Sequence, residues 1–469
     1  MDAPWVELFG PVSGKVRGYH QIVDILGRAI ADGVIRVGDR LPTQRDVSAG
    51  LGVAIGTVTR AYSEAEHQGL IVGRVGVGTF VSGPAARSAN VQQADGHDAV
   101  VDLTTSRPPL EGAATHFANA LRILSKRHDV GKLLGTEPPN GWMRHRIAAS
   151  KWLSRRLAGV EPNQIVMCNG VQHALSSIFA GLAQAGDIVV TEEINYPGVK
   201  LLGDLHRIRL LGVSMDDEGI RADEVAEACK RQAVRFLLCS PTIHNPTTIS
   251  MSTRRRETLT ELAIRYNFTI IENDILGMMA VEGLPSMYQL IPRRTIYVTG
   301  LSKVVAAGLR VGFIVASPSL LQPLMSGVRS TMWMPQPLML EIFAHWVDNG
   351  SIDKVIAWHR EEISARLVMV RQFIDSAELR VNAGSYHVWL PLPNQRRSAD
   401  FVDEAYGQRV ALSPSDTFAI DEVAPNGLRI GIGAPNSRER LSAGLAVIAE
   451  LLANHPRDER LRRSGARSI

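Results

Sequence analysis

Apolar residues near the start of the chain recur at the spacing of an amphipathic helix. They stand at i, i+3, i+4, i+7 and i+8: Ile22, Ile25, Leu26, Ala29 and Ile30. This pattern predicts a first helix with one buried face. Further along, Thr43 followed three residues later by Asp46 predicts the capping box of a short second helix. Gly52 predicts the end of that helix.

The next stretch predicts a third helix and a hairpin. The segment "TVTRAYSEAEHQG" has helical periodicity and ends at Gly69. The segment "LIVGRVGVGTFVS" holds two β-prone runs joined through Gly76 and Gly78. Helix, short helix, turn, helix and hairpin is the order of a winged helix-turn-helix, whose recognition helix enters the major groove of DNA. A small three-helix accessory domain is the alternative interpretation.

The residues of this region are more specific than its order of helices and strands. Across residues 17–82, "GDRLPTQRDVSAGLGV", "TVTRAY" and "GVGTFV" resemble the DNA-binding domain of GntR-type bacterial regulators. The resemblance implies that Thr43, Gln44 and Arg45 contact phosphates and bases. It places Thr57 and Arg60 on the recognition helix. It also implies that Gly78 lets the wing approach the minor groove. Ile55 stands where many family members have arginine, so we expect a different base readout.

From residue 100 the pattern changes to short apolar runs that alternate with longer helical stretches. The β-prone runs are "QIVMC", "DIVVT", "RFLLC", "FTIIE", "TIYVT" and "RVGFIVA". Such alternation predicts a mainly parallel sheet covered by helices, with ligands at the carboxyl ends of the strands. The sequence therefore predicts an α+β head at residues 1–83, a flexible linker at 84–99 and a large α/β domain at 100–455. A basic tail follows at 456–469.

Polar residues follow several of these expected strands. "CNGVQHALSSIF" leaves a strand through Asn169 and Gly170 and enters a helix, whose free N–H groups predict a phosphate cradle. Asn245, Asp274 and Lys303 follow three other strands. Each of these three side chains alone is more readily interpreted as a turn cap or a surface lysine. Together they meet the needs of pyridoxal phosphate: a lysine for the aldehyde and a carboxylate for the pyridine nitrogen.

Residues 100–455 resemble the fold-type I aminotransferases, in the order Gly-x-Gln, Tyr-Pro-Gly, Asn-Pro, Asp, Ser-Lys and Arg. The resemblance implies that Lys303 is the Schiff-base lysine and the catalytic residue. Its further cofactor-binding residues are Asp274 at the pyridine nitrogen, Asn245 at O3′, Tyr196 against the ring, and Val171, Gln172, Ser302 and Arg310 around the phosphate. Arg429 in "GLRIGIGAP" would hold the carboxylate of a substrate or effector.

A GntR-type head on this body resembles the MocR subfamily of bacterial regulators. The resemblance implies a cytoplasmic homodimer that binds a double-stranded DNA operator and senses pyridoxal phosphate or an amino compound. Four positions depart from the aminotransferase pattern: Thr136, Thr248, Leu276 and Gly300. We therefore expect a sensor with at most weak transaminase activity. The alternatives are an active aminotransferase with an added head and a regulator that has lost the cofactor.

Composition changes this interpretation little. The net charge of +4 is not concentrated in the head, where eight basic residues balance eight acidic ones through residue 83. No apolar run is long enough to predict a membrane span, and the acidic start "MDAPWVELFG" does not resemble a signal peptide. The three cysteines lack the spacing of metal ligands, so no metal site is predicted.

Overall fold

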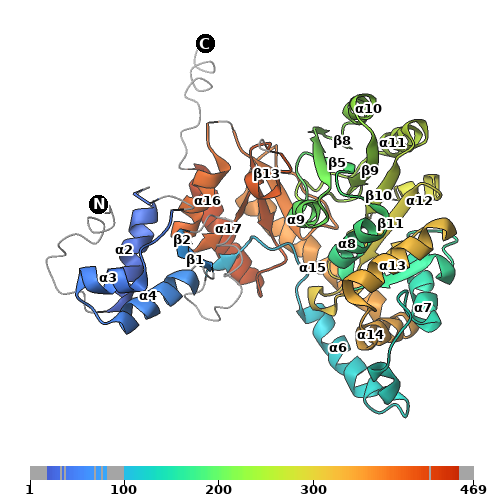
Figure 1. The fold of residues 1–469 in the computed structure, drawn as a ribbon, viewed down its shortest axis with the longest axis horizontal. Coiled ribbons are helices and arrows are strands. Elements are labelled where there is room, and N and C mark those ends of the chain that lie inside the picture. The colour runs from blue at the N-terminus through green and yellow to red at the C-terminus, as the bar shows by residue number, and fades with distance from the viewer. Residues whose placement is uncertain are drawn as a thin grey trace. The chain divides into compact units, whose positions relative to one another are not determined.

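The structure, a computed structural model, divides into two compact units, Met1–Asp102, which includes the head, and Leu103–Ile469, which includes the body (Figure 1). It describes residues 18–31, 34–35, 39–67, 70–74, 78–81, 100–281, 283–393, 395–421 and 424–453. The predicted linker and tail, and the expected turn positions Gly69 and Gly76, lie outside these ranges.

The head has the predicted order of three helices and a hairpin. Its elements are α2 (Tyr19–Ala31), α3 (Gln44–Leu51), α4 (Ile55–His67), β1 (Ile71–Arg74) and β2 (Gly78–Val81). Strands β1 and β2 pair antiparallel. The capping box of α3 is present, and Gly52 adopts the left-handed conformation at its end. The winged helix-turn-helix prediction is confirmed.

The apolar stripe of α2 forms the head's core. Ile22, Leu26, Val58 and Ala61 are fully buried, and they belong to one cluster that also includes residues of the hairpin. Backbone hydrogen bonds from Leu41 to Thr79 and from Val81 to Asp39 tie the segment before α3 to the hairpin. The head therefore has a hydrophobic core of its own.

The body is built on a seven-stranded sheet of order β4-β12-β11-β10-β9-β5-β6. The strands are β4 (Ile165–Cys168), β5 (Ile188–Glu192), β6 (Arg209–Val213), β9 (Val234–Cys239), β10 (Thr269–Asn273), β11 (Thr295–Gly300) and β12 (Gly312–Val315). Only β12 runs antiparallel to its neighbours in this sheet. All six predicted strands are present, which confirms the mainly parallel sheet. The seventh, β6, was not predicted.

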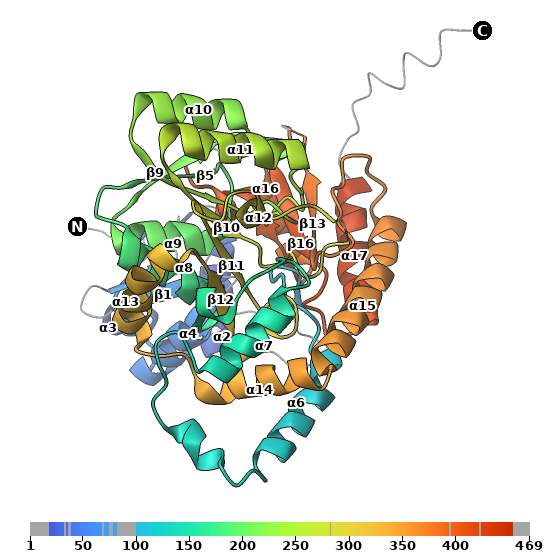
Figure 2. The same cartoon turned by 90° about the vertical axis from the view of Figure 1, so that its right-hand side faces the viewer.

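Helices cover both faces of this sheet (Figure 2). One face carries α8 (Gly170–Leu182), α9 (Pro197–His206) and α13 (Leu321–Met332). The other carries α10 (Ala222–Arg231), α11 (Thr253–Tyr266) and α12 (Met287–Leu290). Each face is sealed by its own apolar cluster, as expected for strands that are apolar on both sides.

The remaining elements flank the sheet and form a smaller C-terminal part. The helices are α6 (Glu111–Leu124), α7 (Met143–Leu153), α14 (Pro337–Asp348), α15 (Ser351–Phe373), α16 (Ser398–Gly407) and α17 (Arg438–Ala453). A three-stranded antiparallel sheet has the order β13 (His387–Pro391), β16 (Gly427–Gly431) and β15 (Ser413–Pro414). The short strands are β3 (Val101–Asp102), β7 (Met215–Asp216), β8 (Gly219–Ile220) and β14 (Val410–Ala411). The 3-10 turns are η2 (Val130–Leu134), η3 (Pro162–Gln164), η4 (Ala307–Leu309), η5 (Pro318–Leu320) and η6 (Ser415–Phe418).

Within the described residues, no helix is both long enough and apolar enough to cross a membrane. No group of three or more His, Cys, Asp or Glu side chains in those ranges could hold a metal ion.

Candidate functional site

The candidate side chains gather where the strands of the large sheet end. Gly170 follows β4, Asn245 follows β9, Asp274 follows β10 and Lys303 follows β11. Because β4, β9, β10 and β11 run in one direction, their carboxyl ends share one edge of the sheet. This edge is where open α/β sheets bind their ligands.

Asp274 is fully buried, and only one of its two carboxylate oxygens has hydrogen-bond partners. Its Oδ2 accepts hydrogen bonds from Arg156 Nε at 2.8 Å and from the Tyr297 hydroxyl at 2.9 Å. Its Oδ1 has no hydrogen-bond partner among the described residues. A buried carboxylate oxygen without a partner is expensive. Arg156 and Tyr297 therefore orient the carboxylate and leave one oxygen available for a donor from a ligand.

The surroundings of Lys303 lower the pKa of its side-chain amine. Its Nζ donates to the carbonyl oxygen of Ser106. Burial, followed by the charges of Arg429, Arg310 and Arg107, lowers the pKa of Lys303 to about 7. An ordinary lysine has a pKa near about 10.4. A large fraction of Lys303 is therefore neutral and nucleophilic near neutral pH.

Arg310 and Gly170 lie together at the start of α8, where the sequence predicts a phosphate cradle. Gly170 has φ 80°, and a Cβ there would lie 2.8 Å from Arg310 Nη2. Only glycine therefore lets the Arg310 guanidinium lie against the helix start, where it donates to the Asn169 carbonyl at 3.3 Å. Its Nη1 also donates to the Ser302 hydroxyl at 3.2 Å. The free backbone N–H groups at the start of α8, which include that of Val171, suit a dianion together with the Arg310 guanidinium.

Tyr196 and Gln172 meet over Gly198. A Cβ at Gly198 would lie 2.2 Å from Tyr196 Cε1 and 2.4 Å from Gln172 Oε1. Gln172 donates to the Gly198 carbonyl at 3.0 Å, and its Oε1 is buried without a hydrogen-bond partner. Tyr196 is 39% exposed. The tyrosine ring thus packs against the chain on one side and keeps an accessible face.

Arg429 is already partly engaged. Its Nη1 donates to Asn245 Oδ1 at 2.8 Å, its Nη2 donates to the Thr104 carbonyl, and the guanidinium lies 4.6 Å from the centre of the Phe418 ring. The resemblance assigns Arg429 and Asn245 to different ligands, whereas here they contact each other. An incoming carboxylate would therefore compete with Asn245 for this guanidinium.

A buried histidine completes the surroundings of the lysine. Ser106, whose carbonyl accepts from Lys303, also places its hydroxyl 2.9 Å from His387 Nδ1. Burial, then the charges of Arg429 and Lys303, hold the pKa of His387 well below its usual range. His387 is therefore neutral at physiological pH, and it adds no further positive charge to the pocket.

In the head, the predicted DNA-binding residues lie at the surface of the helix-turn-helix. Thr43 is exposed and its hydroxyl belongs to the capping box of α3. Gln44 accepts a hydrogen bond from Thr59 on α4 at 2.8 Å, which ties the two helices together. Arg45 is exposed.

Arg60 on α4 is exposed, and its guanidinium lies 4.4 Å from the centre of the Tyr19 ring. Thr57, one turn earlier, is half-buried. Gly78 has φ 133°, and a Cβ there would lie 2.8 Å from Arg40 Nε. Arg40 therefore adds a basic group beside the hairpin that the sequence had not singled out.

Comparison with known proteins explains this pairing of sites. Residues 98–448 match the family "Aminotransferase class I and II", and residues 18–81 match "Bacterial regulatory proteins, gntR family". The chain belongs to the class I and II aminotransferase family. Its head is a GntR-type DNA-binding domain. Proteins of this aminotransferase family depend on pyridoxal phosphate.

One relative matches nearly the whole chain, and two others match a smaller share of it. The chain is 25% identical to the uncharacterized HTH-type transcriptional regulator YdeF of Bacillus subtilis, over 92% of this chain and 94% of that protein. It is also 26% identical to the 2-aminoadipate transaminase of Thermus thermophilus, over 71% of this chain and 84% of that protein. The solved structure of an archaeal alanine:glyoxylate aminotransferase superposes with a TM-score of 0.72 at 24% identity, covering 79% of this chain and 95% of that chain.

The residues of this aminotransferase-family body fit pyridoxal phosphate. The unpartnered Asp274 oxygen suits a protonated pyridine nitrogen, and Lys303 is a nucleophilic amine. The cradle of Gly170, Ser302 and Arg310 suits the phosphate. The role of each site residue stays a prediction.

The four departures from the aminotransferase pattern have visible structural settings. A Cβ at Gly300 would lie 2.6 Å from the Val311 carbonyl oxygen, so the missing hydroxyl cannot be restored there without backbone movement. Leu276 is 2% exposed and supplies no polar group. Thr248 holds φ 63°, a strained conformation for a β-branched residue, and Thr136 is exposed.

Several residues that surround Asp274 and Lys303 are far from them in the sequence and were not predicted. Arg156, in "WLSRRLAG", resembles any arginine at a helix end, and Tyr297 resembles a core strand residue. Ser106 and Arg107 lie in the segment that leads into the body, about 200 residues before Lys303. Sequence periodicity carries no signal for such contacts, because they arise only when distant segments pack together.

Proposed function

We propose that this chain is a DNA-binding transcription regulator whose body binds pyridoxal phosphate and senses an amino compound. One observation carries the proposal: a single chain joins a GntR-type head to a body that keeps Lys303, Asp274 and Arg310 in a cofactor-like arrangement. Such a regulator would act in the cytoplasm, where bacterial DNA lies.

The residues divide the work of holding the cofactor. Lys303 would bind the aldehyde carbon, and Asp274 would hold the proton on the pyridine nitrogen with the support of Arg156. Arg310, Ser302 and the first amides of α8 would hold the phosphate. When bound, pyridoxal phosphate supplies an aldehyde that captures primary amines and a ring that accepts electrons. Capture of an amine is sufficient for sensing.

The remaining pocket chemistry favours an effector with a carboxylate. Arg429 is 8% exposed and bonded to Asn245, so a carboxylate that binds it must displace that amide. A bidentate arginine–carboxylate pair is stronger than a bond to a neutral amide. The exchange would change contacts between the C-terminal part of the body, where Arg429 lies on β16, and the segment after β9, which carries Asn245.

We further propose that the body forms a homodimer. Large apolar side chains are exposed on adjoining elements: Ile123 on α6, Leu134 on η2, Met143 and Ile147 on α7, and Leu338 on α14. Figure 2 shows these elements at one end of the body. Leu134 is 92% exposed, which is unusual for a leucine unless a partner covers it.

The effector should act through Arg429. In the Arg429→Ala protein we expect the visible band of the bound cofactor to remain, because Lys303 and Asp274 are unchanged. The effect of amino acids on operator affinity should disappear, a loss of the 5–150-fold change that couplings of about 1–3 kcal/mol produce. The measurement is operator binding with and without a panel of α-amino acids. Arg221→Ala, at the N-cap of α10, where the arginine pairs with Asp223, is the control.

A normal response of the Arg429→Ala protein to its effector would show that another group recognises the carboxylate. Loss of the cofactor band in that variant would instead place Arg429 among the cofactor ligands.

Aminotransferase activity is the second candidate function, because Lys303 and Asp274 are retained. We expect amino-group transfer to 2-oxo acids to run below about 1 per second, the lower end of ordinary enzymes. Leu276 offers no hydroxyl and Gly300 leaves no room for one, so the cofactor is held less well for repeated proton transfer. Steady-state assays with the purified protein test this. Turnover at hundreds per second would identify an enzyme.

A further inference from the structure

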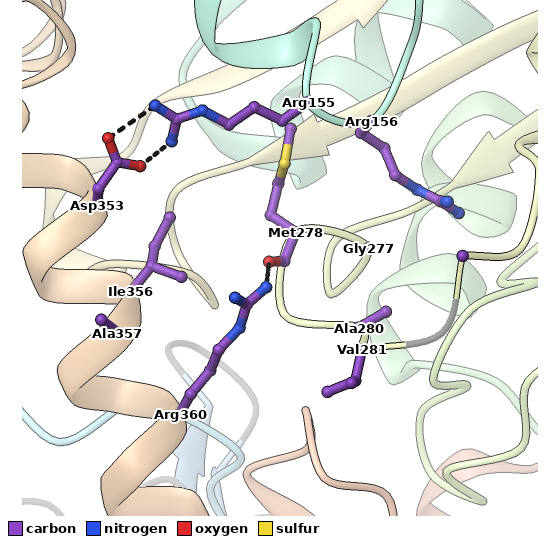
Figure 3. Close-up of a pocket in the computed structure, with 11 residues that line it drawn as sticks. Arg155, Arg156, Gly277, Met278, Ala280, Val281, Asp353, Ile356, Ala357 and Arg360 are labelled. Carbon is purple, nitrogen blue, oxygen red and sulfur yellow. Dashed lines mark hydrogen bonds and ion pairs between the residues drawn. The ribbon is translucent and has the colours of Figure 1, made fainter.

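A cavity lies beside the cofactor-binding residues, with Arg156 in its wall. Its volume is about 470 Å³, within the range of about 300–1,000 Å³ that small-molecule sites occupy. Three segments form it: the turn after α7 with Arg155 and Arg156, the loop after β10 with Met278, and α15 with Asp353 and Arg360 (Figure 3).

Two of the three arginines are matched by carboxylates. Arg155 makes a two-pronged pair with Asp353, with Nη2 2.7 Å from Oδ2. Arg156 directs its Nε to Asp274, and its other nitrogens donate to the Leu284 carbonyl and the Thr242 hydroxyl. Both positive charges are therefore balanced nearby.

Arg360 is the unmatched charge. Its Nη2 donates to the Met278 carbonyl at 2.9 Å, and no carboxylate among the described residues lies within ion-pair distance of it. Figure 3 shows this side chain reaching from α15 across the cavity toward Met278. Its remaining N–H groups keep the planar fork that suits a carboxylate. Glu282, between two lining residues in sequence, lies outside the described ranges.

Apart from the arginines and Asp353, the side chains that line the cavity are apolar. They are Met278, Ala280, Val281, Ile356 and Ala357. One unmatched positive charge beside these apolar side chains suits a ligand with one negative charge and a hydrocarbon body. A polyanion would find no second unmatched cation here among the described residues.

We propose that this cavity binds a small organic monocarboxylate, with its carboxylate on Arg360 and its apolar part against Met278 and Ile356. The site is separate from the cofactor-binding edge but shares a wall with it, because the guanidinium of Arg156 contacts Asp274 on one side and lines the cavity on the other. A ligand in this cavity would contact Arg156, which orients the carboxylate of Asp274.

Hexanoate is a suitable probe, with 1-hexanol as its uncharged match. Calorimetric titration of the full chain loaded with pyridoxal phosphate should show saturable hexanoate binding in the millimolar range. Arg360→Met should weaken that binding at least tenfold, and Arg360→Lys should retain more of it because the charge is kept. Arg371→Met, an exposed arginine on the same helix and outside the cavity, should leave it unchanged.

Each contrary outcome overturns the proposal. Absence of saturable hexanoate binding would do so, as would equal affinity for 1-hexanol, since the charge would then contribute nothing. An unchanged affinity of the Arg360→Met protein for hexanoate would also exclude this cavity as the binding site. If Arg429→Ala removes binding instead, hexanoate occupies the pocket at the cofactor site. An unchanged cofactor absorption band in each Arg360 variant verifies that the protein is folded.

Discussion

The Lys303→Ala protein should lose the visible absorption band of bound cofactor completely. No other lysine is assigned to the cofactor, and the band requires a covalent bond between the cofactor and a lysine amine. Lys151→Ala, at an exposed position on α7, should keep the full band and serves as the control. The measurement is the visible spectrum of each purified protein after incubation with pyridoxal phosphate. A band of normal intensity in Lys303→Ala would remove this lysine from the site.

The same lysine predicts how attachment depends on pH. The pKa of Lys303 is lowered to about 7, first by burial and then by Arg429, Arg310 and Arg107. Only the neutral amine attacks an aldehyde, and its fraction grows as the pH rises through that pKa. The rate at which the band forms should therefore increase between about pH 6 and 8 and level off above, well below the usual lysine range near about 10.4. A rate that still climbs steeply at pH 9 would mean that the amine is not perturbed.

Local rules account for most of what the sequence predicted. The α3 capping box depends on two residues three positions apart, and Thr43 with Asp46 form it. The strands that were predicted are short apolar runs buried on both faces, such as β4 and β11. Strand β6 lies at one edge of the sheet, where Arg209 is exposed and its neighbours are half-buried. It was missed because Arg209 and Gly212 leave only Leu210 and Leu211 as adjacent large apolar residues, whereas β4, at the other edge, is a continuous apolar run.

The site is only partly local. Strand ends could be predicted, so Asp274 and Lys303 could be placed at one edge of the sheet. The partners of these side chains could not, because Arg156 is 118 positions from Asp274 and Ser106 is 197 positions from Lys303. The bond between Arg429 and Asn245 is of the same kind. Such contacts follow from the completed packing of the body, and they decide which groups are available to a ligand.

The full chain should bind its operator about 10²–10⁴-fold more tightly than the isolated head, residues 1–83. The head holds equal numbers of basic and acidic residues, so few phosphates are neutralised per head and its salt dependence should be shallow. Linking two heads through a dimer of bodies makes the second contact intramolecular, which raises affinity without new contacts. The gain requires that the heads reach half-sites about 34 Å apart.

Two further variants separate the contributions of head and dimer. Leu134→Arg places a charge on the exposed apolar face, so we expect the body to become monomeric and operator affinity to fall toward that of the head alone. Arg45→Ala in the full chain should weaken binding through the head itself while the dimer persists, since Arg45 is exposed on α3. Affinities come from titrations of one operator at several salt concentrations, with oligomeric state measured by sedimentation. Equal affinity of head and full chain would mean that the body adds nothing to DNA binding. A dimeric Leu134→Arg protein would place the subunit interface elsewhere.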